Sequence, residues 1–257
     1  MSLISGLRAE TLPAPPTDLQ RPLALFLDLD GVLAPMAPSP DAVVADPRRT
    51  AVLGRLDRAL EGRLAIVSGR TLSEIDRIAD RSTPSAAGVH GLERRRRNGA
   101  VDRPAASAGV ARALAAFHEF AAHRPGVLVE DKTISAGLHY RQAPDSGAQA
   151  LRLARDLAAS TGLTMQPGHM VVELRTPGSD KGGAVTAFMA EAPFAGATPV
   201  MLGDDLTDEA GFRAAEALGG FGVLVGPHRE TAARFGLGGV PDVMDWLEAV
   251  ADRLEAR

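Results

Sequence analysis

The sequence predicts an α/β protein in which a parallel sheet flanked by helices is interrupted by an inserted α+β unit. Two hydrophobicity patterns support this fold class. In the first and last thirds of the chain, uninterrupted apolar runs end directly in turn residues, which is typical of parallel strands buried on both faces. In the middle third, apolar and polar residues alternate, as in an antiparallel sheet with one open face. We therefore expect residues 23–105 and 177–257 to form the core and residues 106–176 the inserted domain.

The first elements of the core follow from short local signals. Residues 1–22 contain several prolines and are expected to form an irregular leader of weak order. The apolar run that starts at Leu23 predicts the first strand, and leucines at helical spacing then predict a helix that ends near residue 60. Leu64–Val67 is a second buried strand, and Thr71 with Glu74 forms a capping box that opens the next helix.

A run of four arginines at residues 94–97 follows a short strand expected near Gly88. The run precedes Asn98-Gly99, which is a strong signal for a hairpin turn. We expect these arginines to lie on a hairpin and to be mostly solvated. The net charge of −4 also argues against a nucleic-acid partner.

The middle third is expected to contain two helices and four strands. The helices are expected from about residue 107 and near 146–160, and the strands near 127–131, 133–141, 163–167 and 169–175. Alternation places His139 and Arg141 on the face opposite Leu138, and Glu173 on the face opposite Val172. One face of this sheet should therefore cover the helices while the other carries charged side chains.

Beyond Pro177 the pattern of buried strands resumes. We expect a helix from about residue 180, a strand at Pro199–Leu202, a helix after Thr207 and a strand at Gly222–Gly226. Hinges are expected near residues 100–107 and 176–180, where the two patterns meet.

Polar side chains follow three of the predicted core strands. Asp28 and Asp30 come after the first strand, Ser68 after the second, and Asp204 with Asp205 after a third. The carboxyl ends of parallel strands meet at one edge of a sheet, where ligands bind. A single aspartate after a strand could equally serve a turn or a helix cap. Several carboxylates together, with no histidine or cysteine nearby in sequence, suit a hard cation such as Mg²⁺.

Composition excludes several other classes of protein. The chain is 45% hydrophobic and 23% charged, which is ordinary for a globular protein with a sizeable core. It contains no cysteine, so disulfides and thiolate metal sites are excluded. We find no export signal and no apolar run approaching the ~18 residues of a membrane span. These features predict a cytoplasmic protein with no membrane partner.

Four segments, in chain order, resemble the four motifs of haloacid dehalogenase (HAD) phosphatases: Asp28-Leu29-Asp30-Gly31, Ser68-Gly69-Arg70, Lys181 and Gly203–Glu209. Further segments make the chain most similar to the trehalose-6-phosphate phosphatases within that superfamily. They are Val67–Arg70, His90–Glu93, Glu130–Lys132, His139–Arg141, Val172–Arg175 and Gly178–Gly182. The resemblance spans about residues 22–226 and implies a Rossmann-like HAD core with an α+β cap domain for substrate specificity.

The resemblance also implies an activity and catalytic roles. It implies a Mg²⁺-dependent phosphomonoester hydrolase that releases trehalose from trehalose 6-phosphate through an aspartyl-phosphate. Asp28 would be the nucleophile and Asp30 the general acid and base. Ser68 and Lys181 would hold the phosphate oxygens. The implied metal ligands are the Asp28 carboxylate, the Asp30 main-chain carbonyl and Asp204, with Asp205 or Asp208 completing the shell.

Substrate choice is expected to come from the polar face of the inserted sheet and the neighbouring core loops. The expected substrate-binding residues are Ser68, Gly69, Arg70, His90, Gly91, Glu93, Glu130, Lys132, His139, Arg141 and Glu173. Asp208 is a secondary site residue that could orient Lys181. The open sheet face could also simply be solvated, without any ligand.

Several alternatives remain open at the level of sequence. The same fold could act on another sugar phosphate, such as sucrose phosphate or a hexose phosphate, or could return the phosphoryl group to a sugar as a transferase or mutase. It could also bind trehalose 6-phosphate without catalysis, as a sensor or as the partner of a trehalose-6-phosphate synthase. The complete set of Asp28, Asp30, Lys181 and Asp204 argues against a silent domain. We expect a monomer.

Overall fold

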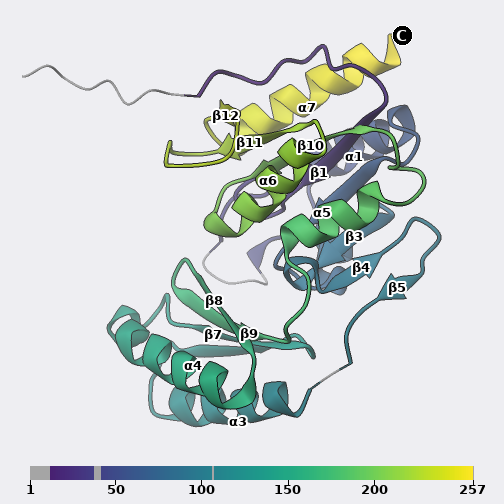
Figure 1. Cartoon of the computed structure of the whole chain (residues 1–257). Helices are drawn as coiled ribbons and strands as arrows, with labels where there is room; N and C mark the ends of the chain where they lie inside the picture. Colours follow the sequence, from purple (N-terminus) through teal and green to yellow (C-terminus); the bar gives the residue numbers. More distant parts are fainter. Residues whose placement is uncertain (1–11, 38–41, 106, 257) are drawn as a thin grey trace, which may run out of the picture.

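The computed structural model describes residues 12–37, 42–105 and 107–256. It contains two units, each built on its own sheet, with the smaller unit below the larger one in Figure 1. The smaller unit is inserted between β5 and α5, so the chain crosses from one unit to the other twice. This architecture confirms the predicted α/β core with an α+β insertion. The domain bounds stated above stay a prediction.

The larger sheet has eight strands and forms the centre of the core unit. In spatial order they are β12 (Phe235–Leu237), β11 (Phe221–Val225), β10 (Thr198–Gly203), β1 (Leu23–Leu27), β2 (Leu64–Val67), β3 (Ser85–Gly88), β4 (Glu93–Arg95) and β5 (Val101–Asp102). The strands from β12 to β3 are parallel, whereas β4 and β5 are antiparallel to their neighbours. Every residue of β1 and β2 is buried, as the uninterrupted apolar runs predicted.

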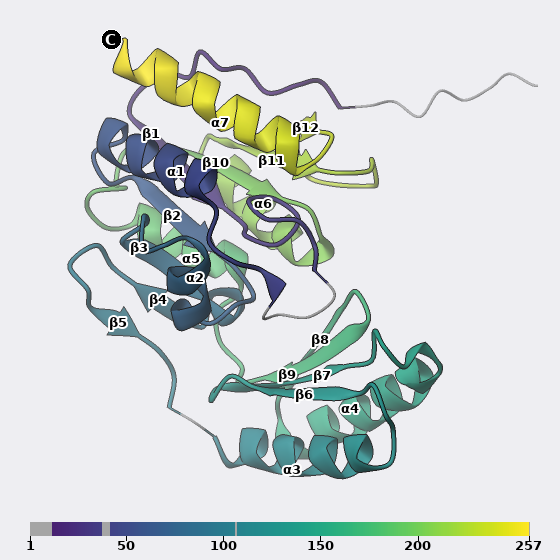
Figure 2. The same ribbon diagram turned by 180° about the vertical axis from the view of Figure 1, so that it is seen from behind.

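Helices cover both faces of the large sheet (Figures 1 and 2). One face carries α1 (Pro47–Ala59), α2 (Leu72–Ile78) and α7 (Val240–Glu255), and the other carries α5 (Lys181–Met189) and α6 (Glu209–Ala217). The capping box predicted for α2 is confirmed, since Glu74 N donates to Thr71 Oγ1 and the Glu74 side chain accepts from Thr71 N. Apolar side chains on the two faces form two separate clusters.

The inserted unit is an antiparallel sheet with two helices on one face (Figure 2). Its strands, in spatial order, are β6 (Leu128–Asp131), β7 (Ser135–His139), β9 (Val171–Arg175) and β8 (Thr164–Gly168), and its helices are α3 (Ala108–Ala122) and α4 (Gly147–Thr161). Ala136, Leu138, Val172 and Leu174 are buried in one cluster with apolar residues of both helices. The predicted alternation is therefore confirmed, and the opposite face of the sheet is turned toward the core unit.

The N-terminal leader is packed more firmly than predicted. Residues 12–22 form no helix or strand, but they lie along α7 (Figure 1). Trp246 Nε1 donates to the Pro16 carbonyl at 3.1 Å, Gly236 N donates to Pro13 O at 2.9 Å, and Leu19 is buried. The expectation of weak order is wrong for this part, because hydrogen bonds hold it to α7 and β12 and Leu19 packs into a core cluster. The rest of the leader lies outside the described residues.

The arginine run does form the predicted hairpin, since residues 94 and 95 lie on β4, which pairs with β5. The expectation that its side chains are mostly solvated is wrong for Arg94, Arg95 and Arg96, which are 11%, 17% and 31% exposed, whereas Arg97 is exposed. Each is ion-paired to the core: Arg94 and Arg96 with Glu191, Arg95 with Asp76 and Arg97 with Asp57, all at 2.6 to 2.7 Å. These carboxylates come from distant parts of the chain, so sequence spacing alone could not reveal them.

Within the described residues, no helix combines the length and the apolar character needed to cross a membrane.

Candidate active site

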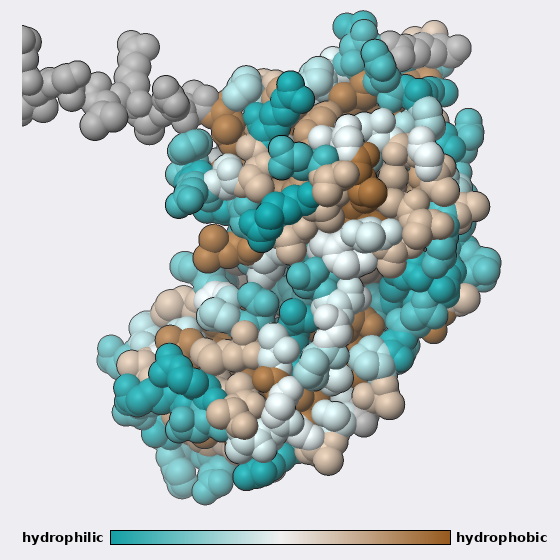
Figure 3. Space-filling view, in the orientation of Figure 1, coloured by the Kyte–Doolittle hydropathy of each residue, from teal (hydrophilic) through white to brown (hydrophobic). Residues whose placement is uncertain are grey.

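A cavity of about 660 Å³ lies between the carboxyl ends of the core strands and the polar face of the inserted sheet. Figure 3 shows the hollow between the two units from one side. Asp28, Asp30, Ser68, Asp204 and Asp205 line its core side, because each follows the end of a parallel strand. The structure thus brings together the polar residues that the sequence placed after separate strands.

Asp28 and Lys181 form the buried floor of this cavity. Asp28 is 5% exposed and Lys181 is 2% exposed. Lys181 Nζ lies 3.0 Å from Asp28 Oδ2 and donates to Asp208 Oδ1 at 2.7 Å. Lys181 is the first residue of α5, where the Asp180 side chain caps the helix by accepting from Gly183 N. The predicted contact between Asp208 and Lys181 is therefore present.

Carboxylates outnumber cations at this floor. Carboxylate oxygens of Asp28, Asp204 and Asp208 lie within 4.8 Å of one another. Burial raises the pKa of Asp28 well above its ordinary value, with neighbouring aspartates adding to the shift against the opposing charge of Lys181. Burial, together with the charges of Asp208 and Asp205, raises the pKa of Asp204 to about 7. A cation bound among these groups would relieve the repulsion.

Both carboxylate oxygens of Asp208 accept hydrogen bonds from the protein, including two from the loop at Asp204 and Asp205. Asp28 and Asp204 are therefore the carboxylates best placed to bind a cation. Asp208 Oδ1 accepts from Lys181, while its Oδ2 accepts from Asp204 N and Asp205 N at 3.0 and 3.1 Å. Gly31, with φ of +78°, makes room for Asp204: a Cβ added at Gly31 would lie 2.1 Å from Asp204 Oδ2. The donor set is all oxygen, which fits a hard divalent cation.

Asp205 lies at the rim of the cavity and has a local role as well. Its Oδ1 accepts from Thr207 N at 2.7 Å and from Thr207 Oγ1 at 2.5 Å, which starts the short 3₁₀ turn Leu206–Asp208. Burial acts to raise the pKa of Asp205, but the charge of Lys181 and the bonds from Thr207 lower it below its ordinary value. Asp205 is therefore the carboxylate of this group that ionises most readily.

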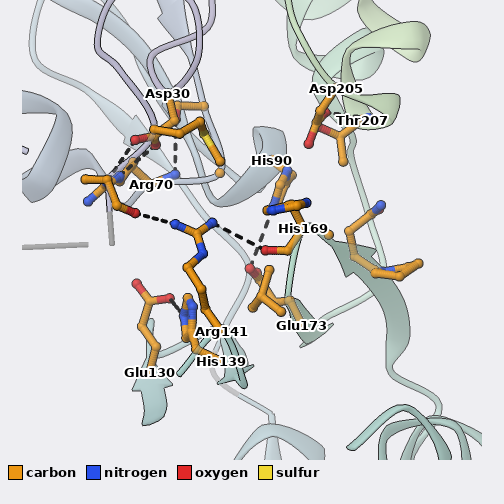
Figure 4. Close-up of a pocket in the computed structure, with 18 of the residues that line it drawn as sticks. Asp30, Arg70, His90, Glu130, His139, Arg141, His169, Glu173, Asp205 and Thr207 are labelled. Atoms are coloured by element: carbon orange, nitrogen blue, oxygen red, sulfur yellow. Dashed lines mark hydrogen bonds and ion pairs between the residues drawn. The ribbon is translucent and has the colours of Figure 1, made fainter. Parts of the chain in front are cut away.

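Asp30 stands at the mouth of the cavity, paired with Arg70 (Figure 4). Arg70 Nε and Nη2 donate to the two carboxylate oxygens of Asp30, each at 2.8 Å. Arg70 Nη1 donates to Glu74 Oε1 at 3.1 Å. Arg70 lines the cavity as predicted, but its guanidinium is occupied by protein carboxylates.

The inserted sheet contributes a charged wall in which acidic and basic groups balance. Lys132 Nζ donates to Glu173 Oε2 at 2.8 Å and lies 3.5 Å from Glu130 Oε2, which is 2.8 Å from His139 Nε2. Burial favours the neutral form of Glu173, but the charge of Lys132 and the neighbouring His90 lower its pKa well below the ordinary value. Burial opposes the charge of Lys132, yet Glu173 and Glu130 raise its pKa.

This wall also contains a buried acceptor that the described protein atoms do not satisfy. Glu173 is 5% exposed and lines the cavity, and its Oε1 has no hydrogen-bond partner among the described residues. A buried polar atom without a partner is unfavourable and uncommon in native structures. Glu173 therefore offers an acceptor to a ligand with hydroxyl groups.

His90 connects the core to this wall (Figure 4). Its Nε2 lies 3.6 Å from Glu173 Oε2, and its buried Nδ1 has no partner among the described residues.

Val89 and His90 both have positive φ, 47° and 54°, which is unusual for two consecutive residues and especially for a β-branched valine. The strain is held by hydrogen bonds from Val89 N to Arg70 O and from His90 N to Ser68 O. Gly69 leaves the space that the ring occupies, since a Cβ there would lie 2.7 Å from His90 Cε1.

Two polar bridges join the inserted unit to the core at the cavity. Lys132 Nζ donates to Gly69 O at 2.9 Å, and Arg141 donates to Ala37 O. Arg141 also donates to His169 O at 3.4 Å (Figure 4). Both side chains line the cavity as predicted, and both also contact protein carbonyls.

Two predicted substrate-binding residues, Gly91 and Glu93, do not line this cavity. Gly91 packs against the chain before α5, where an added Cβ would lie 2.3 Å from Asp180 O. Glu93 is turned toward α2, and its Oε2 accepts from Leu72 N at 3.2 Å. Their segment turns away from this cavity after His90, and their role in substrate binding stays a prediction. The remaining predicted residues line the cavity: Ser68, Gly69, Arg70, His90, Glu130, Lys132, His139, Arg141 and Glu173.

The sequence reasoning missed several residues of the cavity wall. They include Met36, Ala37, Leu128, Gln142, Gln166, His169 and Thr207. Gln166 could have been found, because it alternates with Met165 on β8 and pairs with Glu173 in the sheet register. Met36 and Ala37 lie in an irregular proline-rich loop, where no periodic signal exists.

The loop that carries Asp205 is braced by a second ion pair. Glu209, 8% exposed, accepts from Arg229, from Thr231 Oγ1 at 2.8 Å and from Ala232 N at 2.8 Å. Arg229 Nη2 in turn donates to Asp205 O at 2.6 Å. Glu209 thus fastens the β11–β12 loop to the acidic loop, and as the first residue of α6 it also places a negative charge at the N-terminus of that helix.

Comparison with known proteins gives this geometry a context. The family model described as trehalose-phosphatase matches residues 26–237. A trehalose-6-phosphate phosphatase from Escherichia coli strain K12 is 41% identical over 242 residues, which cover 93% of this chain and 91% of the relative.

Solved structures show the same fold. A trehalose-6-phosphate phosphatase related protein has a TM-score of 0.73 at 26% identity, covering 89% of this chain and 97% of its own. A HAD subclass IIB sugar phosphatase has a TM-score of 0.59 at 14% identity, covering 91% of this chain and 98% of its own. With an α/β core, an inserted sheet over the strand ends and a family match over most of its length, the chain belongs to the trehalose-phosphatase family of HAD-fold enzymes.

Proposed function

We propose that this enzyme hydrolyses trehalose 6-phosphate to trehalose and phosphate, using Mg²⁺ and an aspartyl-phosphate on Asp28. The observation that carries the proposal is the buried Asp28–Lys181 floor beneath a wall with an unsatisfied Glu173 oxygen. A phosphate group can bind at Asp28 and Lys181 while sugar hydroxyls bind the charged wall of the inserted sheet. The family match and the name of the E. coli relative support the choice of sugar.

The first half of the reaction would transfer the phosphoryl group to Asp28. A carboxylate oxygen of Asp28 forms a bond to phosphorus, and the bond between phosphorus and the sugar oxygen breaks. Asp30, at the mouth of the cavity, gives its proton to that sugar oxygen, and trehalose leaves. Lys181 and Ser68 would hold the phosphoryl oxygens from below, where Lys181 Nζ is already 3.0 Å from the nucleophile.

The second half would restore the enzyme. Water attacks the phosphorus of the aspartyl-phosphate, its proton goes to Asp30, and the bond from phosphorus to Asp28 breaks to release phosphate. The sum is one trehalose 6-phosphate and one water converted to one trehalose and one phosphate. Asp30 alternates between acid and base, so it ends in its starting protonation state.

Mg²⁺ would be held by the carboxylates of Asp28 and Asp204 and the main-chain carbonyl of Asp30, with Asp205 completing the shell directly or through water. When bound, it neutralises the repulsion between the phosphate and the attacking carboxylate. The excess of buried carboxylates over cations supports a divalent ion here. The space that Gly31 leaves for Asp204 also supports it.

The wall of the inserted domain would recognise the sugar. Glu130, Lys132 and Glu173 would contact the distal glucose, with His90 contributing from the core. A site built to bond hydroxyls discriminates strongly, because its buried polar atoms stay unpaired when the wrong substrate binds. Glu173 Oε1 and His90 Nδ1, which find no hydrogen-bond partner in the part of the chain that the structure describes, support this role.

The test is to incubate the purified enzyme with trehalose 6-phosphate and measure both phosphate and free trehalose. Mg²⁺ should give equal amounts of the two products, and EDTA should abolish both. Binding of the substrate without release of products would identify a silent binding domain and overturn the proposal. Phosphate appearing on a second sugar would identify a transferase or mutase.

A further inference from the structure

The guanidinium of Arg70 forms ion pairs with two carboxylates, those of Asp30 and Glu74. Its fork binds both oxygens of Asp30 at 2.8 Å, and its remaining amino group binds Glu74 Oε1 at 3.1 Å. The Arg70 side chain is 10% exposed, whereas the Asp30 side chain is 28% exposed. A two-point contact between a planar guanidinium and a carboxylate fixes direction as well as distance. The more buried partner therefore determines where the carboxylate of Asp30 lies.

Arg70 is itself fixed by the start of α2. Glu74 Oε2 accepts from Thr71 N at 3.0 Å and from Thr71 Oγ1 at 2.8 Å, so the capping box holds the carboxylate that holds Arg70. Arg70 N also lies 3.2 Å from Ser68 Oγ, its acceptor. A continuous set of contacts thus runs from the helix to Asp30.

Among the described residues, the hydrogen bonds to the carboxylate of Asp30 come from Arg70. The turn after β1 is held by main-chain bonds, from Gly31 N to Ala34 O at 2.8 Å and from Leu33 N and Ala34 N to Leu29 O at 2.9 and 2.8 Å, and none of these fixes the Asp30 side chain. A partly exposed aspartate in a turn can adopt several side-chain rotamers. The two bonds from Arg70 select one of them.

We propose that Arg70 is a positioning residue that holds Asp30 for proton transfer, and not a ligand of the phosphate or sugar. The inference rests on the proposed function, in which Asp30 gives a proton to the leaving sugar oxygen and later takes one from water. In each step one carboxylate oxygen of Asp30 exchanges a proton with the reacting group, while the other oxygen keeps its hydrogen bond from Arg70. Glu74 keeps Arg70 in place throughout.

The test compares trehalose 6-phosphate with p-nitrophenyl phosphate in Arg70→Met. A sugar alkoxide needs a proton in order to leave, whereas p-nitrophenolate leaves without one. For trehalose 6-phosphate, kcat should fall about 100-fold and KM should change less than about threefold, as expected for a misplaced general acid. For p-nitrophenyl phosphate, the first turnover should stay near the wild-type rate and be followed by slow turnover, because hydrolysis of the aspartyl-phosphate still needs Asp30.

Further variants separate position from charge and guard against misfolding. Arg70→Lys keeps the charge but loses the fork, so it should recover only part of the lost rate. Glu74→Gln leaves Arg70 in the chain and should lower kcat in the same way by a smaller factor. Arg58→Met, on the exposed side of α1, should match the wild type.

Three results would overturn the inference. The first is a rise in KM for both substrates at constant kcat in Arg70→Met, which would make Arg70 a substrate ligand. The second is an unchanged kcat of Arg70→Met for trehalose 6-phosphate. The third is a full recovery of the rate in Arg70→Lys. Failure of the proposed function would look different, because the wild-type enzyme would then release no trehalose from trehalose 6-phosphate.

Discussion

Both walls of the cavity carry carboxylates, but the two walls differ in how these carboxylates are paired. On the core side, Asp28, Asp204 and Asp208 lie close together beside Lys181, and burial raises the pKa of each aspartate. On the side of the inserted domain, glutamates pair with Lys132 and His139, and their pKa values are lowered.

This difference separates two tasks. The core wall holds more carboxylates than cations, so a bound cation would stabilise their ionised form. The glutamates of the inserted domain already have partners in Lys132 and His139, so this wall suits an uncharged ligand rich in hydroxyls. We infer that chemistry belongs to the core and choice of sugar to the inserted domain, and the predictions below test that division.

The largest effect is expected from Asp28→Asn. Loss of the proposed nucleophile should lower kcat by more than about 10⁴-fold for trehalose 6-phosphate and p-nitrophenyl phosphate alike. The fold should survive, since asparagine has the same shape and removes a poorly solvated charge. Steady-state assays and a thermal melt check both points. Asp252→Asn, on the solvent side of α7 with its side chain 69% exposed, is the control. Near-normal turnover would refute the assignment of the nucleophile.

The next largest effect is expected on KM in Glu173→Ala, and it should differ between a substrate with a sugar and one without. Glu173→Ala removes a charged acceptor worth roughly 2 kcal/mol to a bound hydroxyl, so KM for trehalose 6-phosphate should rise about 30-fold. KM for p-nitrophenyl phosphate, which has no sugar, should change less than about threefold. Glu119→Ala, exposed on α3, should leave both values unchanged. Equal effects on the two substrates would break the division between chemistry and recognition.

A smaller effect is expected from the brace behind Asp205. Glu209→Gln weakens the hold of Arg229 on the Asp205 carbonyl, so the Mg²⁺ concentration for half-maximal activity should rise about tenfold. At saturating Mg²⁺ kcat should recover, and Mg²⁺ should raise Tm less than in the wild type. Arg213→Met, beside Glu209 on α6 but 65% exposed, is the matched control. A loss of kcat that Mg²⁺ does not restore would contradict this role.

The smallest effect is on stability and depends on pH. The folded-state pKa of Glu173 is depressed below its ordinary value of 4.5, so its ion pair stabilises the fold above pH 4.5 and loses this effect as pH falls through the folded-state pKa. Glu173→Gln should lower the free energy of unfolding by about 1 kcal/mol at pH 7. In urea titrations this difference should shrink below pH 4.5. A difference that grows under acid would show that Glu173 is not held as an anion.

The core half of the site was predictable because strand ends determine it. Asp28, Ser68 and Asp204 each follow an apolar run that reads as a buried strand, and parallel strands bring their carboxyl ends together. The wall of the inserted domain was predictable from alternation, which turns Glu130, His139 and Glu173 to one face.

The remainder depends on contacts that no local pattern encodes. The positive φ values of Val89 and His90 turn the chain so that Gly91 and Glu93 leave the cavity. The positive charge of Arg70 suggests a residue that binds phosphate. Only the fold reveals that its guanidinium is paired with Asp30 and Glu74. Tertiary partners of this kind are decided by packing between distant segments.

The most direct test of the division between the two walls is the wild-type kcat/KM for a panel of esters with Mg²⁺. The panel contains trehalose 6-phosphate, sucrose 6-phosphate, glucose 6-phosphate and p-nitrophenyl phosphate. The value for trehalose 6-phosphate should exceed that for glucose 6-phosphate by about 100-fold or more, because glucose 6-phosphate lacks the second glucose that we propose binds the wall of the inserted domain. Equal values across the panel, or a preference for another sugar phosphate, would contradict the account.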